Sequence, residues 1–377
     1  MLRHSCVIRK RQSLQNITTM KNTINLFLEL VKIDSPSGEE KSISMFLDEK
    51  LKNLGFLVQK DKLGQLWASS SSSNPLLITA HMDTVEPGKN IKPKIVNGVI
   101  QSCGKTILGA DNKAFIAALL IAIEEYIHSH GKLPPIELIF SVKEETGGGI
   151  DNFPFDWIKA KKGITFDLAQ PLGKITIQAP YITNFSATFI GKAAHSSKPE
   201  DGINSLICAT SFVNNIKMGR IDSETTVNIG KISGGTGINT IPENSIVEGE
   251  VRSANINAFN LLIKEIESQA IKSSKSYKVK MLFDLNGYCP GYKYSNNDSF
   301  IANISDLLES KHCDVIQYES TGVSDANIIA NKGIKFLCLS DGVENPHTNS
   351  EQISIKNLIK LKDLILEIIN NASDLVR

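Results

Sequence analysis

Continuously apolar runs alternate with a helical pattern along the first half of the chain. Leu76–Ala80 and Ile136–Val142 are apolar throughout, as in strands that are buried on both faces of a sheet. Between them, Asn112–Ser129 has the pattern of a helix that is apolar on nearly all sides at its start, which indicates a core helix. This alternation predicts an α/β fold around a mixed, largely parallel central sheet.

Weaker patterns place the other elements of the same domain. Apolar residues at helical spacing predict a first helix at Thr23–Lys32 and a second helix that starts at Glu39-Glu40 and extends to about Leu54. The remaining elements are short strands at Phe56–Gln59 and Gln65–Ser69, strands near Val315 and at Phe336–Leu339, and helices near Ser299–Ser310 and Ser350–Asn371.

From about Pro180 the order of elements changes to βαββαβ. The strands are Asn184–Gly191, Thr225–Ile232, Ser245–Arg252 and Tyr277–Leu285, and the helices are Asn204–Met218 and Ala258–Lys272. This order is that of a ferredoxin-like sandwich. We therefore expect a small domain at residues 180–288, inserted into a larger domain that is formed by residues 20–179 and 289–377.

Charge and cysteine usage narrow the class of protein. The net charge of +1 gives no field that would favour nucleic acid or an anionic membrane, and no apolar run is long enough to span a bilayer. The six cysteines lack paired spacing, which argues against a disulfide framework and favours a cytoplasmic protein. Residues 1–19 are basic but lack the apolar stretch of a secretory signal, so they are either a transit-like arm or, as we favour, an extension ahead of the fold.

Five acid and histidine clusters stand at strand ends or beside glycine turns. They are His81-Met82-Asp83, Gly109-Ala110-Asp111-Asn112, Glu144-Glu145, Phe166-Asp167 and Asn345-Pro346-His347. Active sites of α/β sheets lie beyond the carboxyl ends of strands, where three of these clusters fall. Histidine nitrogens and carboxylate oxygens are the ligands that Zn²⁺ prefers in catalytic sites, so the clusters together predict one buried two-metal site.

Each cluster also has a plainer interpretation when it is considered alone. His81 could be an ordinary turn histidine, although Asp83 would face the same side of an extended chain and could fix its tautomer. Asp111 could cap the core helix, and Asp167 and His347 could be solvated residues of a strand end and a polar loop. All of these interpretations would have to hold at once, which favours the metal site.

The pair Glu144-Glu145 lies between a buried strand and Gly147-Gly148-Gly149, whose backbone can approach a ligand closely. A solvated turn is the usual explanation of such a pair. In this position, however, one carboxylate could bind a metal while its neighbour takes a proton from a water molecule. These are the two roles that metal-assisted hydrolysis requires.

Six ordered motifs resemble those of the zinc aminoacylase/carboxypeptidase family, and their spacing is most similar to its peptidase T (tripeptide aminopeptidase) branch. The motifs are Ile78–Val85, Leu108–Ala114, Glu144–Gly147, Asp167, Gly191–Glu200 and Asn345–Thr348. The match covers nearly everything from Met20 onwards. Two departures concern packing and substrate fit: Phe115 stands where the family often has glycine, and Ser196-Ser197 replaces a common Ala-Gly.

The resemblance implies a role for each candidate residue of the larger domain. Its five metal ligands would be His81 and Asp167 for one zinc, Glu145 and His347 for the other, and Asp111 as the bridge between them. Asp83 would orient His81, and Glu144 would be the general base. The peptide bond between Asp111 and Asn112 would be cis, as is common in the family.

The inserted domain would be the lid of the family, and it would carry the substrate contacts. His195 resembles the residue that polarises the scissile carbonyl, while Asn239 and Arg252 resemble substrate-binding positions. The guanidinium of Arg252 suits a peptide carboxylate because it forms two parallel hydrogen bonds. Homodimerisation through this domain is possible. An exposed histidine and a surface arginine at a strand end are the plainer alternatives.

We therefore expect a cytoplasmic metallopeptidase with two Zn²⁺, for which Co²⁺ or Mn²⁺ could substitute, that hydrolyses small peptides and binds neither nucleic acid nor membrane. An amidase or deacylase of N-acyl amino acids on the same site is the alternative enzyme. A non-catalytic peptide-binding protein is the alternative from another class, and the free base at Glu144 argues against it.

Overall fold

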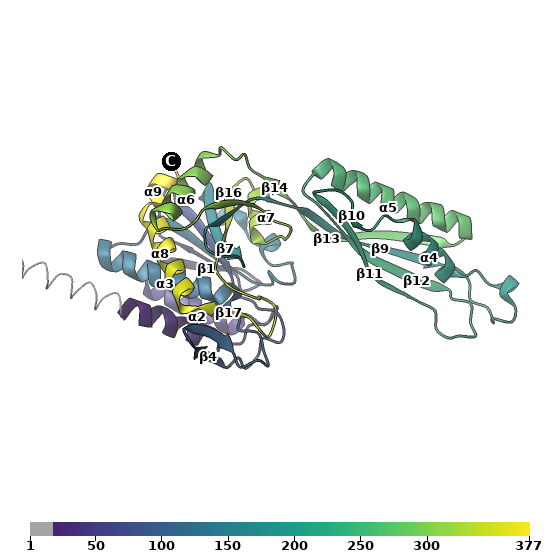
Figure 1. Cartoon of the computed structure of the whole chain (residues 1–377), viewed down its shortest axis with the longest axis horizontal. Coiled ribbons are helices and arrows are strands. Elements are labelled where there is room, and N and C mark those ends of the chain that lie inside the picture. Colours follow the sequence, from purple (N-terminus) through teal and green to yellow (C-terminus); the bar gives the residue numbers. More distant parts are fainter. Residues whose placement is uncertain (1–17) are drawn as a thin grey trace, which may run out of the picture. The chain divides into compact units, whose positions relative to one another are not determined.

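The structure is a computed structural model that describes residues 18–377. It divides into two compact units (Figure 1). The first unit comprises the described residues up to Ile177 together with Tyr294–Glu319 and Ser324–Arg377, and the second comprises Gln178–Lys293 and Ser320–Val323. The predicted insertion at residues 180–288 lies within the second unit, whereas the short segment Ser320–Val323 was not predicted to belong to it. The basic segment 1–17 lies outside the described residues.

A nine-stranded mixed sheet forms the centre of the first unit. Its order is β1-β2-β6-β3-β7-β16-β8-β14, and β15 pairs with β8 off this path. The four central strands β6, β3, β7 and β16 run parallel to one another, and antiparallel strands flank them. The strands are β1 (Leu57–Lys60), β2 (Leu66–Ser69), β3 (Leu76–His81), β6 (Ile136–Ser141), β7 (Lys162–Leu168), β8 (Lys174–Ala179), β14 (Tyr292–Lys293), β15 (Ile316–Glu319) and β16 (Lys335–Ser340). The predicted mixed α/β fold is confirmed, with the parallel part at its core.

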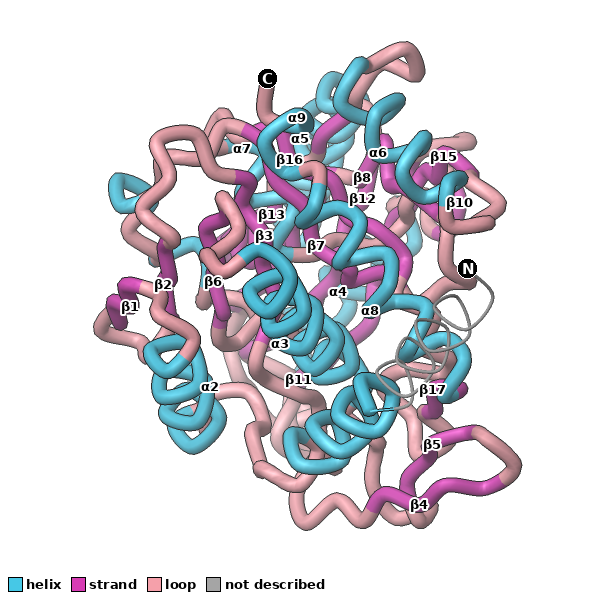
Figure 2. The backbone as a smooth tube through the Cα atoms, turned by 90° about the vertical axis from the view of Figure 1, so that its left-hand side faces the viewer, coloured by secondary structure: helices cyan, strands magenta, loops and turns pink. Residues whose placement is uncertain are grey.

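Helix α3 (Ala110–His130) is the core helix that the sequence predicts, since every residue from Asn112 to Ile123 is buried. It lies beside α8 (Ile355–Asn370) in front of the sheet (Figure 2). The other helices of this unit are a helix over residues 18–30, α2 (Lys41–Asn53), α6 (Ser299–Ser310), α7 (Asp325–Asn331) and α9 (Ala372–Leu375), with 3₁₀ turns η1 (Ile150–Asn152) and η2 (Phe155–Trp157). None of the helices in the described part of the chain is long and apolar enough to cross a membrane.

Three predicted helix starts were wrong, and a small sheet was missed. The first helix was predicted to begin at Thr23, but the chain is already helical at residue 18. The last long helix begins at Ile355 rather than near Ser350, because β17 (Gln352–Ser354) pairs with β5 (Val99–Ser102), which in turn pairs with β4 (Pro93–Val96). Helix α2 begins at Lys41 rather than at Glu39-Glu40, since the Glu40 carboxylate accepts backbone hydrogen bonds outside the helix. The spacing of hydrophobic residues indicates which positions are buried. It does not indicate which distant segments pair with one another.

The second unit is a five-stranded antiparallel sheet in the order β10-β11-β12-β9-β13, with two helices packed on one face. Its elements are β9 (Tyr181–Ile190), η3 (Pro199–Asp201), α4 (Ser205–Asn215), β10 (Gly219–Arg220), β11 (Thr225–Gly234), β12 (Asn244–Ser253), α5 (Ile256–Tyr277) and β13 (Lys280–Cys289). Phe185, Phe189, Phe212 and Phe259 form part of its separate core. Apart from the added β10, this is the predicted βαββαβ order.

Candidate active site

The first candidate ligand, His81, ends the buried strand β3 and is only 3% exposed. Its Nδ1 lies 3.1 Å from the backbone carbonyl oxygen of Asp83 and 3.5 Å from the Asp83 carboxylate. The carbonyl can only accept a hydrogen bond, so Nδ1 carries the proton and the Nε2 lone pair is free to bind a metal. The nearer contact is therefore the main chain of Asp83, not the carboxylate that the sequence argument chose.

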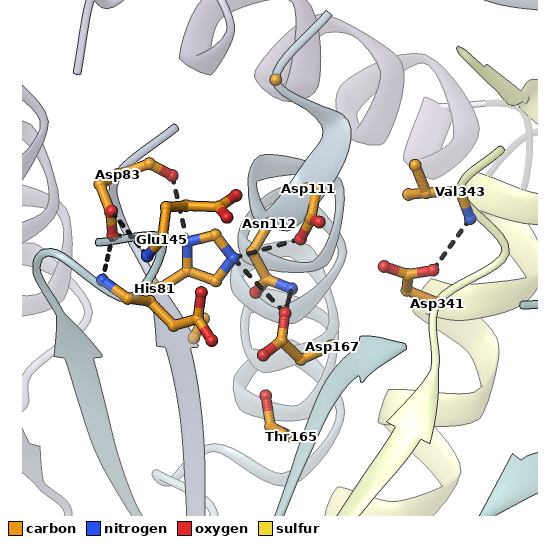
Figure 3. Close-up of polar contacts among 12 residues, drawn as sticks. His81, Asp83, Asp111, Asn112, Glu145, Thr165, Asp167, Asp341 and Val343 are labelled. Atoms are coloured by element: carbon orange, nitrogen blue, oxygen red, sulfur yellow. Dashed lines mark hydrogen bonds and ion pairs between the residues drawn. The ribbon is translucent and has the colours of Figure 1, made fainter. Parts of the chain in front are cut away.

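The Asp83 carboxylate instead holds the loop that bears the two glutamates. It accepts hydrogen bonds from the backbone N–H groups of Glu144 (3.0 Å) and Glu145 (3.2 Å) and from the Ser37 hydroxyl (2.6 Å). Figure 3 shows the contacts of Asp83 with the His81 ring and with the backbone of Glu145. Because Asp83 is fully buried, this carboxylate fixes the direction of both glutamates relative to His81.

Asp111 lies between the two histidines at the start of α3. Its Oδ1 is 3.2 Å from His81 Nε2, and its Oδ2 is 3.5 Å from His347 Nε2. Asp111 and Asn112 have non-helical backbone angles, so α3 is kinked at its start. The Asp111 carboxylate contacts the two histidines, which argues against the alternative that it serves as a helix cap. The peptide bond between Asp111 and Asn112 is cis, which confirms that prediction.

The other ligands converge on the same point from two further segments. His347 Nε2 lies 2.9 Å from Glu145 Oε1, and Asp167 Oδ1 lies 3.4 Å from His81 Nε2. The Asn112 amide donates to the same oxygen of Asp167 at 3.2 Å and so fixes that carboxylate. Asp167 sits near the carboxyl end of β7, beside the end of β3, as the rule for α/β sheets requires.

The charges of this cluster are unbalanced in favour of anions. Burial is the main reason that the pKa of Asp167 rises to about 6, and burial together with Asp167 and other nearby carboxylates raises the pKa of Glu144 well above its usual range. The Asp111 and Glu145 carboxylates raise the pKa of His347 to about 10. In the described part of the chain, several carboxylates thus share two histidines, His81 and His347, as their positive partners.

This donor set fits a divalent cation. Ligand atoms of His81, Asp111 and Glu145 all lie within 4.8 Å of one another, and nitrogen and carboxylate oxygen are the donors that Zn²⁺, Co²⁺ and Mn²⁺ accept. A cation placed among them would neutralise the excess of carboxylates. The geometry therefore brings together all five residues that the sequence proposed as ligands.

Comparison with known proteins identifies the family. The model of the family described as Peptidase family M20/M25/M40 matches residues 77–371. The chain belongs to this family. Its structure is similar to the crystal structures of the aminopeptidase PepT from Bacillus cereus ATCC 10987 (TM-score 0.86) and of a tripeptidase from Staphylococcus aureus subsp. aureus Mu50 (TM-score 0.87). Each is 32% identical to it, and each match covers 94% of this chain and 99% of the other.

Among sequence relatives, Peptidase T from Clostridium perfringens (strain 13 / Type A) is 26% identical over 93% of this chain and 98% of its own length. The predicted resemblance is thereby confirmed, and so is the prediction of a peptide-hydrolysing enzyme. The M20/M25/M40 match begins in β3 and ends just beyond α8, so it includes every candidate ligand.

Two buried aspartates, Asp325 and Asp341, were not among the candidate residues that the sequence analysis proposed. Asp325 begins α7 and accepts a short hydrogen bond from Ser141, at the end of β6. Asp341 follows β16 and accepts from the backbone N–H of Val343 at 2.9 Å, while its Oδ2 has no partner among the described residues (Figure 3). A position directly after a buried strand was the available signal for Asp341. Asp325 stands on a short helix, where no strand pattern marks it.

The three candidates in the second unit are placed on loops and a strand. The Ser197 backbone N–H donates to His195 Nδ1 at 3.2 Å, and the Ser197 hydroxyl lies 2.7 Å from the same nitrogen. In neutral His195, Nε2 therefore carries the proton and points a donor away from this turn. The Asn239 carbonyl accepts from the Ser196 N–H at 2.9 Å, which ties the His195 turn to the loop of Asn239.

Arg252 is already engaged within its own strand. Its guanidinium forms a two-point contact with the Glu250 carboxylate, with Nη2 donating to Oε2 at 2.8 Å, and Nη1 donates to the Thr321 carbonyl at 3.2 Å. Arg252 and Glu250 are partly exposed. A peptide carboxylate that binds Arg252 must therefore displace Glu250 or share the guanidinium with it.

Proposed function

We propose that this M20/M25/M40 chain is a two-metal exopeptidase that hydrolyses tripeptides and similar small peptides. One observation carries the proposal: the two oxygens of Asp111 face two different histidines, each of which has a second carboxylate beside it. This is the arrangement of a bridging carboxylate between two cations. The similarity to an aminopeptidase and a tripeptidase supports peptides as the substrate class.

His81 and Asp167 would hold one cation and Glu145 and His347 the other, with Asp111 shared between them. We propose Zn²⁺ in both places, with Co²⁺ or Mn²⁺ as substitutes. When bound, such cations supply Lewis-acid polarisation of the amide carbonyl and make a nearby water molecule more acidic.

Glu144 is the proposed general base. Its backbone is held by Asp83, so its carboxylate keeps a constant position next to the ligand Glu145. It would take a proton from the attacking water and return it to the departing amine. Burial and the neighbouring carboxylates keep the pKa of Glu144 above the usual range, and a group with a raised pKa is suited to accept and release a proton near neutral pH.

The second unit would supply substrate contacts. His195 Nε2–H is the proposed donor to the oxygen that becomes negative as water attacks, because Ser197 leaves that nitrogen protonated. Asn239 and Arg252 are proposed to bind the peptide, with Arg252 directed to its terminal carboxylate. A homodimer formed through this unit and a cytoplasmic location belong to the same proposal. The location rests on Cys103, Cys208, Cys313 and Cys338 as free thiols.

A substrate panel with and without a chelator tests this function. We expect the purified protein to carry close to two metal equivalents, to cleave tripeptides such as trialanine, and to lose that activity after chelation and regain it with Zn²⁺. Faster cleavage of N-acetyl amino acids than of any peptide would favour the deacylase. No cleavage of either class by metal-loaded protein would leave a peptide-binding protein, and full activity after exhaustive metal removal would refute the proposal.

A further inference from the structure

A buried glutamate outside the ligand set contacts the segment that carries the bridging residue. Glu351 is 1% exposed, and its Oε2 accepts hydrogen bonds from the backbone N–H groups of Leu108 and Gly109, both at 2.7 Å. Its Oε1 accepts from the N–H of Asp111 at 3.0 Å. One carboxylate thus accepts hydrogen bonds from three backbone N–H groups around the start of α3, those of Leu108, Gly109 and Asp111.

Helix α3 has no cap of its own at this end. The first N–H groups of a helix lack internal partners, and a side chain at the N-cap usually satisfies one of them. Here the N-cap is Gly109, which has no side chain, and the helix is kinked directly after it, because Asp111 and Asn112 have non-helical backbone angles. Glu351 replaces that cap from about 240 positions further along the chain, and its negative charge suits the positive end of the helix dipole.

At its other end Glu351 belongs to the loop that carries His347. Its backbone N–H donates to the carbonyl of Thr348 at 3.0 Å, and the loop is closed by a pair of backbone hydrogen bonds between Glu344 and Gln352. Asn345 and His347 both have positive φ, 53° and 61°, a conformation that non-glycine residues keep only where the surroundings impose it. The loop therefore depends on contacts of this kind.

We propose that Glu351 is a positioning residue for the metal pair, which fixes the backbone of the bridging Asp111 relative to the loop of His347. This inference rests on the proposed function. The side-chain contact between the two ligands is long, with 3.5 Å between Asp111 Oδ2 and His347 Nε2, so it does not itself align the two segments. The three hydrogen bonds of Glu351 do align the two segments, because one rigid, buried carboxylate group accepts all three.

The substitution Glu351→Gln tests the idea with almost no change in shape. The amide nitrogen of glutamine cannot accept a hydrogen bond. Its NH₂ group would therefore point at a backbone N–H group, and two donors would face each other without an acceptor. We expect metal affinity to fall by about 10–100-fold, the range found for groups that orient ligands. The metal held by Glu145 and His347 should leave first, because both its histidine loop and its bridging ligand are loosened.

The control is Glu344→Gln in the same loop. Glu344 is exposed, and its side chain bonds only to the Gln352 amide in the described part of the chain, so the same chemical change should leave metal affinity within twofold of the parent. Affinity and stoichiometry are measured by titrating metal-free protein with Zn²⁺ in a competing chelator. Circular dichroism of each metal-free variant shows that it is folded.

Wild-type metal affinity in folded Glu351→Gln would overturn the proposal, and a lowered melting temperature alone would leave Glu351 as a helix cap and nothing more. If Glu351→Gln does not fold, Glu351→Asp keeps the charge but is too short to reach all three donors, and it should show the same order of metal loss. Equal loss of both metals from Glu351→Asp would refute the idea that Glu351 aligns the segment of Asp111 with the loop of His347. These measurements need no peptidase activity, so they fail independently of the substrate assignment.

Discussion

Replacing Asp83 with asparagine should loosen the loop that carries Glu144 and Glu145. It should leave no cavity in the core, because the two side chains have nearly the same shape. The carboxylate has two oxygens, and each accepts one backbone N–H, from Glu144 or from Glu145. In either orientation of the asparagine amide, its nitrogen takes the place of one of these oxygens. One N–H would then be buried without an acceptor, and the remaining bonds would lose the assistance of the charge.

The cost follows from these two effects. A hydrogen bond to a charged group contributes about 1.5–3 kcal/mol, and an unsatisfied buried donor costs about 1–3 kcal/mol, so Asp83→Asn should destabilise the fold by about 2.5–6 kcal/mol. At roughly 2–4 °C per kcal/mol, the melting temperature should fall by about 10 °C. Displacement of Glu144 and Glu145 by even about 1 Å should lower the rate by at least roughly 10²-fold.

The assay compares Asp83→Asn with Asp151→Asn, an exposed aspartate in η1 beyond the same loop. Melting is followed in the presence of a chelator, so that metal binding does not mask the change, and tripeptide hydrolysis is followed with Zn²⁺. We expect the control to match the parent in both measurements. If Asp83→Asn also melts within 1–2 °C of the parent and keeps its rate, the hydrogen bonds of Asp83 do not position the loop, and the reasoning fails.

Three further predictions concern individual side chains. Glu144→Gln should keep both metals and lower the rate by about 10²–10⁴, the usual contribution of a general base, as judged by metal analysis and hydrolysis; loss of metal would mean that Glu144 and Glu145 exchange roles. Arg252→Ala should weaken binding of free-acid peptides more than that of the same peptides amidated, and equal losses would make the arginine structural. Nitrogen NMR of the imidazole should show proton occupancy at Nε2 of His195 in the neutral form, reduced in Ser197→Ala and unchanged in Ser196→Ala; an Nδ1–H tautomer in the parent would refute the donor role.

Much of the fold could be predicted from the sequence alone, and the five residues that the sequence proposed as ligands lie close together in the structure. The apolar runs of β3 and β6 and the nearly all-apolar start of α3 record burial, and burial depends mainly on local residue type. The Glu144-Glu145 pair follows β6 closely, and Asp111 stands at the start of α3, so the sequence could place both at the ends of predicted elements.

Pairing between distant segments could not be predicted in this way. The small sheet of β4, β5 and β17 joins residues about 250 positions apart, and β17 is only three residues long, too short to give a period. The same holds for Asp325, whose partner Ser141 lies 184 positions away. A sequence pattern carries no signal for contacts that form only when two segments are brought together.

The sequence by itself determined which chemical groups this M20/M25/M40 chain could bring to a metal, because ligand type and position after a strand are local properties. Only the tertiary structure decided what orients them. His81 is held by the main chain of Asp83, whose carboxylate holds the glutamate loop instead, and Asp111 is held by Glu351 from another loop. Hydrogen bonds act over about 3 Å, so these partners are set by which backbone groups the folded chain leaves unpaired, and no spacing along the chain records that.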